Sequence, residues 1–151
     1  MNRDLYSHNH NKGIWEYHLE WCPKYRKSIF EEEGIRRDCE EILRQAAKAI
    51  GLDVLELAVM PDHVHMISLS RKPADVGRVL FYLKGRSAYE LFKKHPALRR
   101  QYWRGHLWSR GNFSRTVGLD VDKTRSYVRN QSDIHQTKLT NYTEAHAFRR
   151  G

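Results

Sequence analysis

The sequence has few of the features that mark secreted, membrane-spanning or disulfide-stapled proteins. Its two cysteines, Cys22 and Cys39, form no Cys-x-x-Cys pair and suit free thiols in a reducing cytosol. No apolar run approaches the roughly 18 residues that a membrane span needs. The N-terminus is polar and no signal-peptide core follows it. We therefore predict a cytoplasmic globular protein whose 151 residues form one domain without repeats.

Acidic residues are scarce in the second half of the chain. Residues 1–70 hold 9 Lys and Arg against 12 Asp and Glu, whereas residues 71–131 hold 15 against 4. The formal net charge of +9 therefore arises after the midpoint of the chain, where aromatic residues are interleaved with the basic ones. This asymmetry indicates a polyanionic partner, most simply nucleic acid, with a solvated surface as the alternative.

Apolar periodicity predicts the elements of the first half of the chain. Residues 14–21 alternate between apolar and polar side chains, which is typical of a half-buried strand. An apolar stripe over residues 35–50 predicts a helix that Gly51 ends. Two further strands are expected over residues 54–60 and 63–69, joined by a tight turn or a bulge.

A second helix and a basic loop are expected next. Pro73 is expected to open the helix, and His95 and Pro96 to end it. Side chains off the apolar stripe of this helix, together with those of the loop, are available to phosphates. The candidate contacts with DNA are Lys84, Arg86, Arg99, Arg100 and Arg104.

The last predicted elements are a fourth strand and a third helix. The strand covers residues 107–116, with Trp108 and Phe113 as expected anchors in the core. Gly118 is expected to break this strand, and Asp120 can cap a helix that follows. The order β-α-β-β-α-β-α predicts an α+β fold: one antiparallel sheet with helices mainly on one face and the other face open.

Two histidines in the third predicted strand are candidate metal ligands. His63 and His65 are two residues apart, so a strand would present both imidazoles on the same face. His8 and His10 share this spacing but lie in a polar segment without apolar neighbours, so we rank them as surface histidines. The remaining histidines have no partner at useful spacing and are expected to be structural: His18, His95, His106, His135 and His146.

A tyrosine and a glutamine near the end of the basic segment complete the pattern. Tyr127 and Gln131 are neighbours at i and i+4 on the last predicted helix. The Gln131 amide oxygen is a plausible third metal ligand, and the Tyr127 phenol a nucleophile towards phosphorus. The reference pKa of a tyrosine phenol is about 10, so a bound cation would have to assist its attack at neutral pH. Asp62, next to His63, is expected either to accept a hydrogen bond from that imidazole or to form part of a turn.

His63-Val64-His65 followed by Tyr127-x-x-x-Gln131 resembles the HUH endonuclease superfamily. More narrowly, residues 11–131 resemble the single-tyrosine transposases of the insertion-sequence-200/605 family. The other segments similar to that family are His18–Arg26, Val59–Asp62, Leu83–Gly85, Trp108–Phe113 and Thr116–Gly118. Asn112 and Glu20 depart from the usual family residues, which affects details of DNA contacts and not the reaction.

This resemblance implies a ferredoxin-like core with the histidine site on the open face of the sheet. It further implies Mg²⁺ or Mn²⁺ bound by His63, His65 and Gln131, and recognition of hairpins in single-stranded DNA at element ends. Tyr127 would form a 5′-phosphotyrosine before strand transfer. The expected protein is a homodimer with shared active sites. Residues 1–12 and 132–151 would be tails, and 119–131 a mobile helix carrying Tyr127.

Two alternatives belong to other classes of protein. A domesticated relative would grip DNA or RNA hairpins without cutting them, but such a binder has no need of Tyr127, His63, His65 and Gln131 together. A zinc hydrolase would use the two histidines, but no evident carboxylate or third histidine completes a typical zinc site. The sequence therefore favours a transposase.

Overall fold

The computed structural model describes residues 13–120 of the chain. Its strands are β1 (Gly13–Pro23), β2 (Asp53–Val59), β3 (Val64–Ser70) and β4 (Trp108–Asp120). Its helices are α1 (Glu33–Ala49), α2 (Val76–Lys94) and the short α3 (Pro96–Gln101), with single 3-10 turns η1 (Lys24–Arg26) and η2 (Ile29–Glu31). Within this part of the chain no helix is long and apolar enough to cross a membrane.

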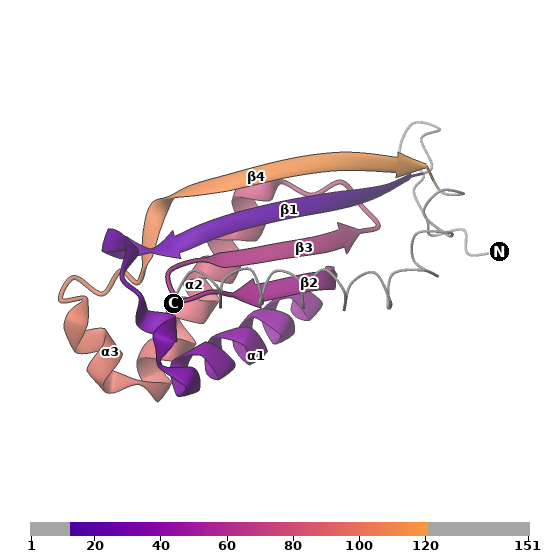
Figure 1. Ribbon diagram of the computed structural model, residues 1–151. Helices are drawn as coiled ribbons and strands as arrows, with labels where there is room; N and C mark the ends of the chain where they lie inside the picture. The colour runs from indigo at the N-terminus through magenta and orange to yellow at the C-terminus, as the bar shows by residue number, and fades with distance from the viewer. Residues whose placement is uncertain (1–12, 121–151) are drawn as a thin grey trace, which may run out of the picture.

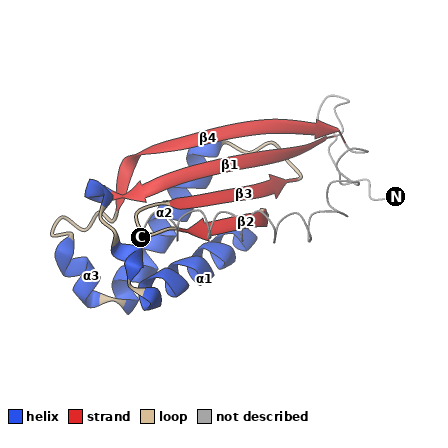
Figure 2. Ribbon diagram, in the orientation of Figure 1, coloured by secondary structure: helices blue, strands red, loops and turns tan. Residues whose placement is uncertain are grey.

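The four strands form one antiparallel sheet in the order β2-β3-β1-β4. Helices α1 and α2 lie side by side on one face of it (Figure 1). The chain order β-α-β-β-α-β with the two central strands first and third in sequence is the ferredoxin-like arrangement. Over residues 13–120 the opposite face carries no helix (Figure 2). The predicted α+β fold is confirmed.

Strand β1 separates the core from the opposite face of the sheet. Tyr17, Leu19 and Trp21 are buried against the helices, as the alternating pattern predicts. Glu16 and His18 point the other way, where Oε1 of Glu16 lies 2.6 Å from Nε2 of His18. Polar side chains on this face are thus partly covered and paired, so the face suits chemistry better than packing.

Helix α1 follows its predicted stripe except at its end. Buried residues from Ile35 to Ala47 pack into the core, but Ile50 is 36% exposed and is wrongly predicted to lie on the stripe. The helix ends at Ala49, and Gly51 adopts a φ of +77° that glycine tolerates without steric penalty. This turn takes Ile50 away from the buried side.

Helix α2 begins later than Pro73, contrary to the prediction from sequence. Asp75 is its N-cap: the carboxylate accepts hydrogen bonds from the backbone N–H groups of Gly77 and Arg78 at 2.8 and 3.3 Å. The predicted basic loop after α2 is also partly wrong, because Pro96 opens α3 there. The buried side of α2 consists of Val79, Leu80, Leu83, Ser87, Leu91 and Phe92.

Strand β4 is longer than predicted. It continues through Gly118 to Asp120, and its pairing with β1 aligns Gly118 with Trp15, so Gly118 does not break it. Trp108 is buried as expected, but Phe113 is 61% exposed because it lies opposite Glu20 on the face away from α1 and α2. The predicted last helix was to start at residues 119–120, which instead belong to β4, and the rest of it, through Tyr127 and Gln131, lies outside the described residues.

Candidate metal and nucleic-acid site

The histidine pair lies where β2 turns into β3. Met60 N–H donates to the His63 carbonyl at 2.8 Å and closes the turn, as the tight spacing predicts. His65 follows in β3 between buried Val64 and Met66, so it points away from the core. His63, directly before β3, and His65, within it, thus lie at the same end of this strand.

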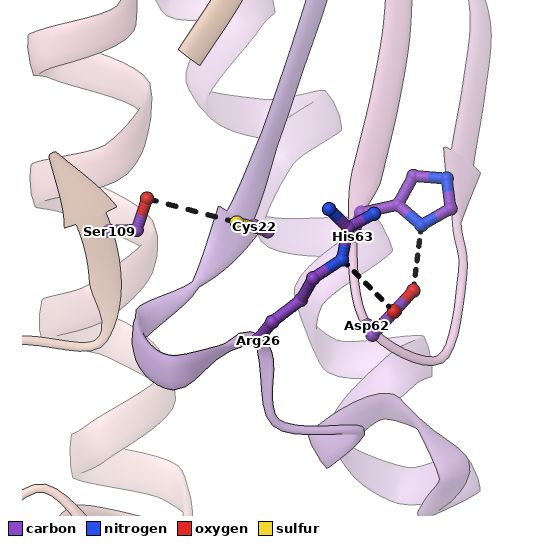
Figure 3. Close-up of polar contacts among 5 residues, drawn as sticks. All are labelled: Cys22, Arg26, Asp62, His63 and Ser109. Carbon is purple, nitrogen blue, oxygen red and sulfur yellow. Dashed lines mark hydrogen bonds and ion pairs between the residues drawn. The ribbon is translucent and has the colours of Figure 1, made fainter. Parts of the chain in front are cut away.

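Asp62 holds His63 on one side. Oδ1 of Asp62 lies 2.8 Å from Nδ1 of His63, and Nε of Arg26 donates to Oδ2 at 3.2 Å (Figure 3). The hydrogen bond from His63, followed by that from Arg26, lowers the pKa of Asp62, so its carboxylate stays ionised and accepts only. His63 consequently carries a proton on Nδ1, which directs Nε2 towards any metal. Of the two alternatives for Asp62, the contact supports the acceptor.

Glu56 makes a longer ion-pair contact with His65. Glu56, in β2, is only 4% exposed, and its carboxylate oxygen lies 3.8 Å from Nδ1 of His65, beyond hydrogen-bond distance. Burial lowers the pKa of His65, while the charges of Glu56 and Glu20 act in the opposite direction. A half-buried imidazole that resists protonation is in the neutral form that binds metal. Both histidines thus face a carboxylate through Nδ1.

The two imidazoles fit a divalent cation that takes a third protein ligand from elsewhere in the chain. No group of three His, Cys, Asp or Glu side chains gathers around a metal position within residues 13–120. Two imidazoles backed by carboxylates suit a cation such as Mn²⁺, with Mg²⁺ as the alternative where availability decides. The predicted third ligand, Gln131, and the predicted nucleophile, Tyr127, lie outside the described residues.

Sequence reasoning missed Arg26 and Glu56. Arg26 is 36 residues from Asp62 in sequence, and no spacing signals their contact. Glu56 interrupts an apolar strand, a weak signal that a buried carboxylate has a partner. Of the histidines expected to be structural, His95 binds Asp38 at 2.7 Å, which confirms its assignment. His8, His10, His135 and His146 lie outside the described residues.

Of the five predicted DNA contacts, two are already bonded to other residues of the protein and three are exposed. The Lys84 ammonium donates to the Ser109 carbonyl at 2.7 Å, and burial lowers its pKa, so it ties α2 to β4. Arg86 donates to the Tyr82 hydroxyl at 2.9 Å and pairs with Glu90. The exposed members are Arg99 and Arg100 on α3 and Arg104 after it. All five stay predictions as DNA contacts.

A groove of about 950 Å³ runs between α2 and the start of β4. Exposed Phe81 and Tyr89 stand on α2 at its side, and Lys93, Arg99 and Arg110 contribute positive charge. None of the residues that line the groove is acidic. The groove is therefore suited to a polyanion, on the side of the sheet away from His65.

Comparison with known proteins identifies the class of protein. A family model described as "Transposase IS200 like" matches residues 13–131. That match covers both histidines, Tyr127 and Gln131, together with the whole of the sheet. The chain is therefore a transposase, of a class that cleaves and transfers DNA strands. It belongs to the IS200-like transposase family.

Individual relatives agree with this family. The ISDra2 transposase TnpA of Deinococcus radiodurans is 34% identical over 119 residues, which cover 78% of this chain and 84% of that protein. The transposase for insertion sequence element IS200 of Salmonella typhimurium is 31% identical over 122 residues, which cover 81% of this chain and 80% of that protein. A crystal structure of a protein assigned as a transposase from Deinococcus radiodurans has a TM-score of 0.65 at 30% identity, covering 83% of this chain and 96% of that one.

Proposed function

We propose that this transposase cleaves and rejoins single-stranded DNA at hairpin-bearing element ends by a metal-dependent tyrosine reaction. The observation that carries the proposal is the histidine pair. His63 directly precedes β3 with the Asp62 carboxylate 2.8 Å from its Nδ1, and His65, opposite Glu20 in the sheet, has the Glu56 carboxylate 3.8 Å from its own Nδ1. Such pairs orient imidazoles for a cation in many metal sites.

In this reaction Tyr127 is the nucleophile. Its phenolic oxygen forms a bond to phosphorus and loses its proton to solvent, while the bond from phosphorus to the 3′-oxygen breaks and that oxygen takes up a proton from solvent. The products are a 5′-phosphotyrosine and a free 3′-OH. A different 3′-OH then attacks the phosphotyrosine, which restores the tyrosine and joins the strands without external energy. The chain thus exchanges one phosphodiester for another.

His63, His65 and Gln131 are the residues that would hold Mg²⁺ or Mn²⁺. When bound, the cation would polarise the phosphoryl oxygen and stabilise developing charge. The protein's own part is to orient the imidazoles. Asp62 does this for His63 through Nδ1, and burial of His65 disfavours its protonated form against the opposing charge of Glu56.

The basic second half of the chain would bind the DNA. Arg99, Arg100 and Arg104 are exposed, and the groove beside α2 combines cations with aromatic rings. We further propose a homodimer in which one chain supplies Tyr127 to the histidine pair of the other.

A covalent adduct tests the function directly. Single-stranded DNA that carries a hairpin and a label at its 3′ end is incubated with protein and Mn²⁺, then run on a denaturing gel. Because the tyrosine would retain the 5′ phosphate of the 3′ fragment, the label should move with the protein. Tyr127→Phe keeps the ring and should bind DNA without forming the adduct. Hairpin binding without any wild-type adduct would instead indicate a non-cleaving binder.

EDTA provides the matched test of metal dependence. Cleavage by wild type should stop when EDTA removes the cation and return when Mn²⁺ is added in excess. His63→Ala and His65→Ala should each abolish cleavage, and Gln131→Ala should weaken it, because two ligands still remain. Cleavage that persists unchanged in EDTA would exclude the metal-dependent reaction.

A further inference from the structure

Two exposed aromatic rings lie at the end of the sheet that carries the histidine turn. Tyr25, in η1, is 68% exposed, and Trp103, after α3, is 79% exposed. Both side chains line the same small hollow, although they are 78 residues apart in sequence. Two large aromatic rings that line one hollow form a candidate interaction surface.

The two loops that present these rings are fastened together. Lys24 N–H donates to the Leu107 carbonyl at 2.7 Å, and the Tyr102 hydroxyl donates to the Lys24 carbonyl at 3.3 Å. Tyr102 itself is buried, so it fixes the loop from beneath. The rings of Tyr25 and Trp103 are therefore carried by one prearranged unit and do not need to be assembled by a ligand.

Two adjacent residues of η1, Tyr25 and Arg26, connect this surface to the histidine turn. Tyr25 and Arg26 have φ values of 65° and 50°, a left-handed conformation that costs free energy in residues other than glycine. The turn leaves the Tyr25 ring in solvent, while the next side chain, Arg26, reaches Asp62 beneath His63 (Figure 3). A ligand on Tyr25 would consequently lie beside the histidine turn.

Cations accompany both rings. The ammonium groups of Lys24 and Lys27 lie 5.5 and 5.9 Å from the centre of the Tyr25 ring, and the Arg104 guanidinium lies 4.7 Å from that of Trp103. None of the residues that line the hollow is acidic. Aromatic faces with adjacent positive charge are the combination that binds unpaired nucleotides, through base stacking and phosphate contacts.

We propose that Tyr25 and Trp103 form a stacking platform for unpaired nucleotides that flank the cleaved phosphate. The partner is single-stranded DNA rather than duplex, because only unpaired bases offer their faces to a protein ring. Lys24, Lys27 and Arg104 neutralise the phosphates of these nucleotides. The placement of the cleaved phosphate rests on the proposed function, whereas the binding of an unpaired strand can be tested without it.

The test uses a short, fluorescein-labelled oligothymidine that cannot form a hairpin. Its dissociation constant is measured by fluorescence anisotropy in EDTA, so that cleavage does not interfere. Tyr25→Ala and Trp103→Ala should each raise the dissociation constant by about fivefold to 100-fold, the range for loss of one stacked base. Tyr25→Phe and Trp103→Phe keep a ring and should stay close to wild type.

The end of helix α1 offers a control. Ile50 is 36% exposed there, so Ile50→Ala removes an accessible apolar side chain from a surface to which no DNA contact is assigned. This control should leave the dissociation constant unchanged. Equal losses in Ile50→Ala and in Tyr25→Ala would overturn the proposal. So would a change in oligomeric state of Tyr25→Ala without DNA, measured by sedimentation, because the surface would then be a protein interface.

Trp103 also provides a spectroscopic signal. It is the most exposed tryptophan described, since Trp21 and Trp108 are 2% and 7% exposed and Trp15 is half-buried. Stacking on a base should quench its emission, and Trp103→Phe should remove most of that quenching. If wild type forms the covalent adduct but these platform variants bind like the control, the platform alone is wrong. Platform losses without an adduct would overturn the catalytic function instead.

Discussion

Asp62 joins two side chains that have different tasks. One of its oxygens faces Nδ1 of His63, and the other accepts from Arg26. Arg26 is largely exposed, and surface ion pairs of this kind add little to stability. The contact is therefore better understood as fixing the orientation of the carboxylate, and through it the ring of His63, than as holding the fold together.

Replacement of Asp62 should consequently change metal affinity more than stability. We expect Asp62→Ala to weaken Mn²⁺ binding about 10-fold to 100-fold, the usual effect of losing a hydrogen-bond partner of a ligand. Asp62→Asn should lose less, because its amide oxygen still accepts from Nδ1–H. Isothermal titration with Mn²⁺ and thermal unfolding give the two measurements. Equal affinities for the alanine and asparagine variants would exclude the orienting role.

His65 should titrate below its ordinary pKa of about 6.5. Burial lowers its pKa and Glu56 partly offsets this, so Glu56→Gln should lower it further. Below pH 6.5 the unfolded chain takes up a proton that the folded chain does not, so this group makes stability fall as pH decreases. NMR titration of the imidazole in metal-free protein checks the direction. A higher pKa in Glu56→Gln would contradict the account.

At the scale of elements, hydrophobic periodicity predicted those helices and strands whose position depends on one buried face. Alternation identified β1, and the apolar stripe identified α1, because each pattern matches one buried face. The start of α2 was missed because Asp75 caps it through two backbone contacts that outweigh the signal of Pro73. The exposure of Phe113 and the contact of Arg26 with Asp62 depend on strands and loops distant in sequence. No local pattern encodes them.

Helix α2 contains a glycine whose side-chain position is empty. A Cβ added at Gly85 would meet no atom within 4 Å, and glycine inside a helix costs about 1 kcal/mol relative to alanine. Gly85→Ala should therefore raise the melting temperature by about 3 °C. Gly77→Ala is the control, because its Cβ would lie 3.1 Å from the capping oxygen of Asp75. No gain from Gly85→Ala in thermal unfolding would contradict this.

At the scale of the whole molecule, charge asymmetry should govern DNA binding. Replacing Arg99, Arg100 and Arg104 with glutamine should reduce the slope of log affinity against log salt by up to about 2, since each phosphate contact on a single strand contributes about 0.7. The control removes as many charges from α1, at Arg36, Arg37 and Arg44. The slope of that control should match wild type. An unchanged slope in the first variant would place the DNA elsewhere.

The last prediction concerns how two chains would share their sites. Tyr127→Phe lacks the nucleophile, and the double variant His63→Ala with His65→Ala lacks the metal ligands, so each protein alone should be inactive. In a heterodimer with shared sites, one site combines an intact histidine pair with an intact Tyr127, while the other carries both defects. Co-expression should then restore part of the cleavage, measured as covalent adduct. If each site is built within one chain, neither site of the heterodimer is intact. A purified heterodimer without cleavage would therefore rule out the shared arrangement.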